Sequence, residues 1–94
     1  MQQITRCDEI SESGSVLLYL YTAEIKSWAT TSLAKLVRKH PTIQFVKTDV
    51  SIPSEIDDIY SVGSVPAFMF LQDRVLIGSY SGTDLKCVAK LVQG

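Results

Sequence analysis

The feature that most constrains this chain is an uninterrupted apolar run at residues 16–21, with turn-forming residues on both sides. A strand that is apolar on both faces is typical of the centre of a parallel sheet covered from two sides. Residues 23–40 follow, and their apolar side chains recur at helical spacing until Pro41, which cannot continue a helix. A buried strand followed by a long helix predicts an α/β fold.

The rest of the chain continues this alternation. Further strands are predicted at residues 3–6, 44–50, 67–71 and 74–79, and further helices at residues 8–13, 53–60 and from Leu85 onward. The last two strands are expected to form a hairpin that turns at Gln72 and Asp73. This order predicts a central mixed sheet, with a parallel core and an antiparallel C-terminal hairpin, flanked by helices. At 94 residues, the chain is expected to form one domain over residues 1–94.

Charge and composition argue against two classes of partner. The net charge is −1 at pH 7 and the basic residues are scattered, which favours neither nucleic acid nor a membrane as a partner. No apolar stretch approaches the roughly 20 residues that span a bilayer. The first six residues do not resemble a secretory signal. The expectation is a cytoplasmic protein, or one whose targeting segment lies outside these residues.

Cys7 and Cys87 are the two cysteines, eighty positions apart. One distant pair is not a disulfide framework and has no metal-ligand spacing, so neither a metal nor a cofactor is expected. Two thiols in a reducing compartment are the default, and a structural disulfide is the minor alternative because its geometry is strict. Inert thiols are favoured over reactive ones, since a cysteine outside a disulfide is commonly a small buried hydrophobe.

Two segments carry a resemblance to a known family. They read Phe-Val-Lys-Thr-Asp-Val-Ser at residues 45–51 and Ser-Val-Pro-Ala-Phe-Met-Phe at residues 64–70. In this order the chain resembles thioredoxin, almost without gaps over residues 16–92. The resemblance implies the thioredoxin fold, which agrees with the element order read from the residues.

The resemblance also implies that the family's chemistry is missing. Thioredoxins work through a Cys-x-x-Cys pair at the start of the long helix, and on this chain the pair falls at Ala23 and Lys26. The family's tryptophan before the pair falls at Thr22, its buried acid at Leu17 and its helix-kinking proline at Thr31. An apolar residue at the acid position is what we expect once no proton has to be moved, because a buried unpaired carboxylate is costly.

A rival alignment places the family's tryptophan at Trp28 and its cysteines at Ala29 and Ser32. It needs an insertion before Trp28 and leaves a helix of only about eight residues before Pro41, below the usual mean of about 11–12. Either alignment removes both sulfurs.

The remaining family features form a candidate binding groove. By resemblance, Pro66 is a cis-proline facing the site, the backbone of Val65 pairs with an extended partner peptide, and Gly82 flanks the groove. The altered loop completes it with Thr22, Ala23, Glu24, Ile25 and Lys26. Two simpler interpretations stay open: Pro66 shapes the start of a strand, and Gly82 serves a helix-entry turn.

The resulting hypothesis is a redox-inactive thioredoxin-like protein that binds a protein partner or acts as an adaptor through this groove, with no catalytic residues. The first alternative is an atypical thioredoxin or monothiol thiol-disulfide oxidoreductase that uses Cys7 or Cys87. The second is a structural subunit of a larger assembly.

Overall fold

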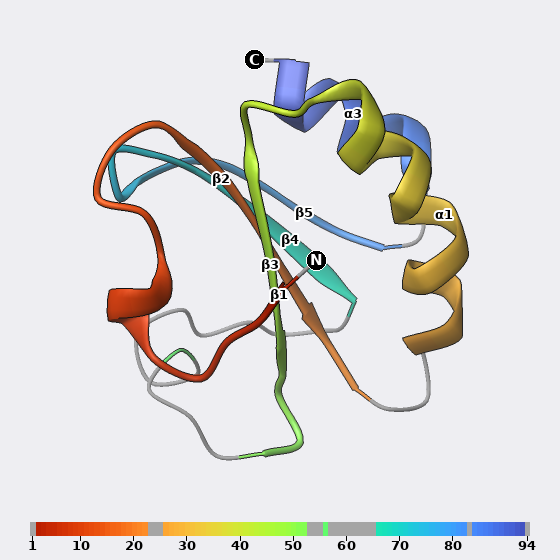
Figure 1. Cartoon of the computed structure of the whole chain (residues 1–94). Coiled ribbons are helices and arrows are strands. Elements are labelled where there is room, and N and C mark those ends of the chain that lie inside the picture. Colours follow the sequence, from red (N-terminus) through yellow and green to blue (C-terminus); the bar gives the residue numbers. More distant parts are fainter. Residues whose placement is uncertain (1, 23–25, 53–55, 57–65, 83, 94) are drawn as a thin grey trace.

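The computed structural model describes residues 2–22, 26–52, 56, 66–82 and 84–93. Five strands form one mixed sheet in the order β1-β3-β2-β4-β5 (Figure 1). Their bounds are β1 Gln2–Gln3, β2 Ser15–Tyr21, β3 Gln44–Asp49, β4 Ala67–Gln72 and β5 Val75–Ser81. The strands β1, β3 and β2 are parallel, and β4 and β5 are antiparallel additions, which confirms the predicted parallel core and C-terminal hairpin.

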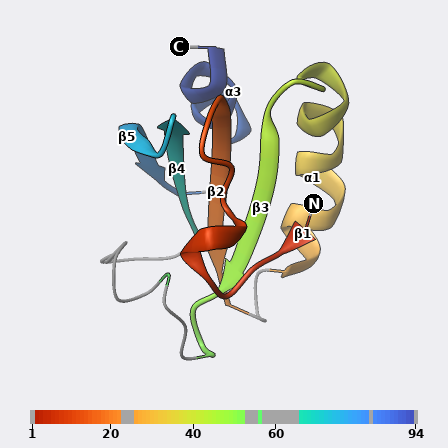
Figure 2. The same ribbon diagram turned by 60° about the vertical axis from the view of Figure 1, so that its left-hand side comes forward.

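Two helices, α1 (Lys26–Lys39) and α3 (Leu85–Gln93), lie on the same side of the sheet (Figure 2). The short 3-10 helix η1 (Cys7–Glu9) lies on the other side. Neither α1 nor α3 is long and apolar enough to cross a membrane. The predicted helix over residues 53–60 falls largely outside the described residues, of which Ile56 is helical and fully buried.

Three predicted boundaries were wrong. The first strand is Gln2–Gln3 rather than residues 3–6, although the Ile4 N–H still donates to the Lys47 carbonyl at 2.8 Å. The predicted helix over residues 8–13 is only η1. It ends early because Ile10 takes an extended backbone that buries its side chain to 2% exposure. The hairpin turns at Asp73 and Arg74, one residue later than expected.

The start of η1 is held by a carboxylate. Glu9 Oε2 accepts hydrogen bonds from the backbone N–H groups of Thr5, at 3.0 Å, and Arg6, at 3.1 Å. These two bonds favour the charged form and lower the pKa of Glu9. The charged carboxylate of Glu9 thus satisfies two backbone N–H groups at the start of η1, where a longer helix is predicted from the sequence.

The core has two layers because β2 is buried on both faces, as its apolar run predicts. Alternate β2 side chains point to opposite faces of the sheet. One face carries Ile4, Ile10, Val16, Leu18, Leu20, Val46, Ile56, Ala67, Met69 and Leu71. The other, beneath α1 and α3, carries Leu17, Tyr19, Tyr21, Leu33, Leu36, Phe45, Phe68, Phe70, Val88 and Val92. Five aromatic side chains from the strands therefore lie in the core on the helix-covered face: Tyr19, Tyr21, Phe45, Phe68 and Phe70.

A buried hydroxyl in β3 lacks a hydrogen-bond partner among the described residues. Thr48 in β3 is fully buried, and its Oγ1 has no hydrogen-bond partner among the residues that the structure describes. A buried polar group without a partner costs about 1–3 kcal/mol. We expect Thr48→Val, which keeps the branched shape and removes the hydroxyl, to raise the free energy of unfolding by about 1 kcal/mol. Urea denaturation measures this, with Thr48→Ala as the control that creates a cavity and should destabilise.

Candidate functional site

The candidate site lies at one end of the sheet, where β2 and β5 end and β4 begins (Figure 1). Leu20 of β2 lies opposite Ala67 of β4, which in turn lies opposite Ser81 of β5. Pro66 precedes Ala67, Gly82 follows Ser81 and Thr22 follows the last residue of β2, Tyr21, so all three lie at this end of the sheet.

Pro66 and Gly82 are brought into direct contact. The Gly82 N–H donates to the Pro66 carbonyl at 3.0 Å and extends the β4–β5 ladder by one bond. Pro66 is buried, whereas Thr22 and Gly82 are half-buried. The sequence placed these residues together only by resemblance, and the sheet register gives the physical reason for their proximity.

Gly82 is required by its own turn. Its φ is +139°, a region that L side chains rarely adopt. A Cβ at this position would lie 2.6 Å from the hydroxyl oxygen of Tyr80. The backbone conformation of Gly82 and the position of Tyr80 therefore support the interpretation that this glycine serves the turn into the helix.

The turn after Gly82 starts α3. The Asp84 N–H donates to Tyr80 Oη at 3.1 Å, and Asp84 Oδ1 accepts from the Lys86 N–H at 2.9 Å. This is an N-cap, in which a carboxylate satisfies a backbone donor at the start of a helix. Tyr80 and Asp84 thus fix the direction in which the chain leaves this end of the sheet.

The other predicted groove residues are less fully defined. Ala23, Glu24, Ile25 and Val65 lie outside the described residues. Lys26 begins α1, and only its backbone is described. Their approach to Pro66, and the cis peptide bond at Pro66, remain predictions.

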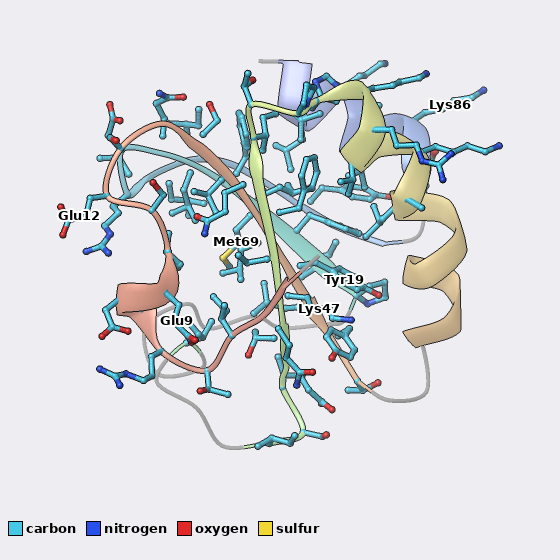
Figure 3. The ribbon with its side chains drawn as sticks, in the orientation of Figure 1. Glu9, Glu12, Tyr19, Lys47, Met69 and Lys86 are labelled. Atoms are coloured by element: carbon cyan, nitrogen blue, oxygen red, sulfur yellow. The ribbon has the colours of Figure 1, made fainter. Side chains whose placement is uncertain are left out.

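A row of stacked rings lies between the sheet and the helices, and it was not anticipated. Tyr19 stacks on Tyr21 with ring centroids 5.2 Å apart and on Phe68 at 4.9 Å. Phe68 stacks in turn on Tyr80 at 6.4 Å. The ammonium of Lys47 lies 5.8 Å from the centre of the Tyr21 ring, and Figure 3 shows Lys47 close to Tyr19. Tyr19 and Tyr21 lie two positions apart in β2, so the sequence alone predicts that their rings share one face of the sheet. Phe68 and Tyr80 join the row because β4 pairs with β2 and β5 pairs with β4.

Burial controls the acidity of two of these phenols. It raises the pKa of Tyr19 to about 12, with a smaller contribution from Tyr21. Burial, and secondarily the charge of Asp49, raises the pKa of Tyr21. Tyr19 and Tyr21 are therefore neutral at physiological pH.

The raised pKa of Tyr19 predicts alkaline destabilisation. The unfolded protein loses the Tyr19 proton near pH 10 and the folded protein near pH 12. The contribution of this protonation to the free energy of unfolding is therefore complete below pH 10 and is lost as the pH rises to 12. Two pH units correspond to about 3 kcal/mol for a fully desolvated group, and solvent screening makes the expected loss smaller. Urea denaturation from pH 8 to 12 should show this fall, and Tyr19→Phe should flatten it. A pH profile unchanged in Tyr19→Phe would contradict the assignment.

The two thiols are separated by the sheet. Cys7 in η1 packs against the face that carries Leu18 and Val46, whereas Cys87 belongs to the first turn of α3 over the opposite face. Both are half-buried and neither forms a disulfide, so the minor alternative of a Cys7–Cys87 bridge is not observed. Among the described residues, no group of three or more His, Cys, Asp or Glu could hold a metal ion.

No family model matches the chain. Glutaredoxin-3 of Mus musculus is 30% identical over 61 residues, which is 65% of this chain and 18% of that protein's length, so the chain spans about a fifth of this relative. Mitochondrial thioredoxin 3 from Saccharomyces cerevisiae, in its oxidised form, aligns with a TM-score of 0.87 at 23% identity, covering 99% of this chain and 93% of the other. The Drosophila germline-specific thioredoxin Deadhead aligns with a TM-score of 0.83 at 21% identity, covering 99% and 97%.

These likenesses agree with the sheet order, the hairpin and the helix placement described above. The chain has the thioredoxin fold.

Proposed function

We propose that this chain is a redox-inactive thioredoxin-like module that binds a protein partner at the end of the sheet formed by Thr22, Pro66 and Gly82. The observation that carries the proposal is the contact between Pro66 and Gly82 at the end of the sheet, in a chain whose sequence holds no Cys-x-x-Cys pair. A partner would add an extended segment there, with backbone hydrogen bonds supplying affinity and nearby side chains supplying selectivity.

The environment of Leu17 supports the absence of dithiol chemistry. Leu17 occupies the family's buried acid position by alignment, and its side chain is fully buried among apolar residues that include Phe45 and Phe68. A carboxylate in such surroundings would lose its hydration without gaining a partner. This position is therefore suited to packing and not to proton transfer.

Insulin-disulfide reduction with dithiothreitol tests the redox part of the proposal. We expect the rate to equal the dithiothreitol background, both for this chain and for its Cys7→Ser/Cys87→Ser variant. Activity that is lost in the double variant would overturn the proposal and assign the chemistry to a thiol outside the family's usual position.

A displayed library of random linear peptides tests the binding part. Peptides enriched on the chain would be synthesised and titrated by fluorescence anisotropy. Pro66→Ala should weaken the binding of these peptides at least ten-fold, which corresponds to about 1.4 kcal/mol. Pro41→Ala is the matched control, because Pro41 is exposed and precedes β3, at the opposite end of the sheet. Equal binding to both variants would place the binding surface elsewhere.

A second candidate function is favoured by one observation, the half-buried Cys87 in the first turn of α3, shortly after Gly82. In this case the chain would be a monothiol oxidoreductase. Alkylation by iodoacetamide at neutral pH separates the two functions: an ordinary, slow rate at Cys87 supports the binding module, and a rate well above that of a small thiol supports chemistry. Cys7→Ser isolates the Cys87 signal.

A further inference from the structure

The outer edge of the sheet exposes three consecutive apolar side chains. Val75, Leu76 and Ile77 in β5 are 62%, 47% and 56% exposed, although the rest of the described sheet hides its large apolar residues. β5 is the last strand of the sheet, so one row of its backbone N–H and C=O groups is not used by β4. The edge therefore combines apolar surface with hydrogen-bonding capacity.

This edge lacks two of the usual protections against pairing. Sheet edges are commonly guarded by charged side chains or proline, and β5, with the sequence Val-Leu-Ile-Gly-Ser-Tyr-Ser, has neither. A single irregularity in register, opposite Phe70 and Leu71, interrupts its ladder with β4. A strand of this composition tends to pair with another strand.

The two charged residues that precede β5 in the sequence are held away from the edge. Asp73 Oδ1 accepts from the Gly14 N–H at 2.7 Å, and Arg74 Nη2 donates to the Ile10 carbonyl at 2.6 Å. Both side chains at the start of β5 are thus turned toward the N-terminal segment. They anchor the hairpin and leave Val75, Leu76 and Ile77 unguarded.

We propose that two copies of this chain associate through β5, antiparallel about a two-fold axis, to form one continuous sheet. A two-fold interface matches a surface with itself, and an uncharged strand meets its own copy without opposing like charges. The net charge of −1 adds little repulsion between the copies. The opposite edge, β1, has only two residues, so pairing stops at two copies. This inference does not rest on the proposed binding function.

The contact is expected to be weak. Stable interfaces bury about 1,200–2,000 Å² in total, and a seven-residue strand with three exposed apolar side chains offers less. The dimer should therefore appear only in concentrated solution, with a dissociation constant of the order of 100 μM.

Sedimentation equilibrium of the intact chain, from about 10 μM to about 1 mM, tests the proposal. The average mass should rise toward that of a dimer. Ile77→Lys and, independently, Val75→Lys should raise the dissociation constant at least ten-fold, and circular dichroism would verify that both remain folded. Ile52→Lys is the matched control, because Ile52 is 48% exposed but lies in the turn after β3. It should associate as the parent chain does.

Several results would overturn the inference. They are a monomer at every concentration, an unchanged dimer in Ile77→Lys and Val75→Lys, and an equal loss of association in Ile52→Lys. Assemblies larger than a dimer would also contradict a closed two-fold pair. Amide hydrogen exchange gives an independent measurement, since protection should increase with concentration in β5 and not in β1.

Discussion

Phe68→Ala should remove about 4 kcal/mol from the free energy of unfolding and lower the melting temperature by roughly 20 °C. Phe68 is fully buried in the central part of the sheet and stacks on both Tyr19 and Tyr80. Its truncation leaves a cavity and removes both ring contacts. Since domains of this size are stabilised by only about 5–15 kcal/mol, a large part of the protein's stability depends on this one ring.

Phe68→Leu is the control for this prediction. Leucine fills much of the cavity but cannot stack, so we expect a loss of about 1–2 kcal/mol. Urea denaturation and calorimetry measure both variants. A cost below about 2 kcal/mol for Phe68→Ala would mean that the site collapses around the smaller side chain and that the ring row contributes little.

Gly82→Ala should cost about 3 kcal/mol, because strain and steric overlap act together. A side chain at φ +139° is strained, and its Cβ would overlap the Tyr80 hydroxyl. The Tyr80 ring cannot easily move aside, since it stacks on Phe68 and its oxygen accepts the Asp84 N–H. If the groove binds a partner, the same substitution should weaken that binding.

Two further variants separate strain from overlap. Gly14→Ala meets a positive φ of +87° but no atom within 4 Å, so it should cost only about 1 kcal/mol. Adding Tyr80→Phe to Gly82→Ala removes the nearest clashing atom, and the double variant should be less destabilised than the sum of the single changes. Strict additivity would show that Tyr80 is not the obstacle.

Much of the fold was predictable because its signals are local. The apolar run of β2 predicts burial on two faces, and the helical spacing before Pro41 predicts the end of α1 near Lys39. Boundaries failed where a distant contact outweighed local preference. The expected helix after Asp8 gives way to an extended Ile10 because that side chain is buried in the core and its carbonyl accepts from Arg74.

The sequence also limits the chemistry of the candidate site. It holds two cysteines eighty positions apart, so no local dithiol motif is present in these 94 residues. The roles of Pro66 and Gly82 came from resemblance alone. Their contact depends on the pairing of β2, β4 and β5, which no local pattern reports.

The sequence by itself determined the alternation of strands and helices, the double-sided burial of β2 and the absence of paired thiols, because periodicity and residue identity are properties of adjacent positions. Only the tertiary structure decided that Tyr21, Tyr19, Phe68 and Tyr80 stack in one row. It also decided that Val75, Leu76 and Ile77 lie on an open edge. Both features depend on strand order and register, and those are set by contacts between residues far apart in the chain.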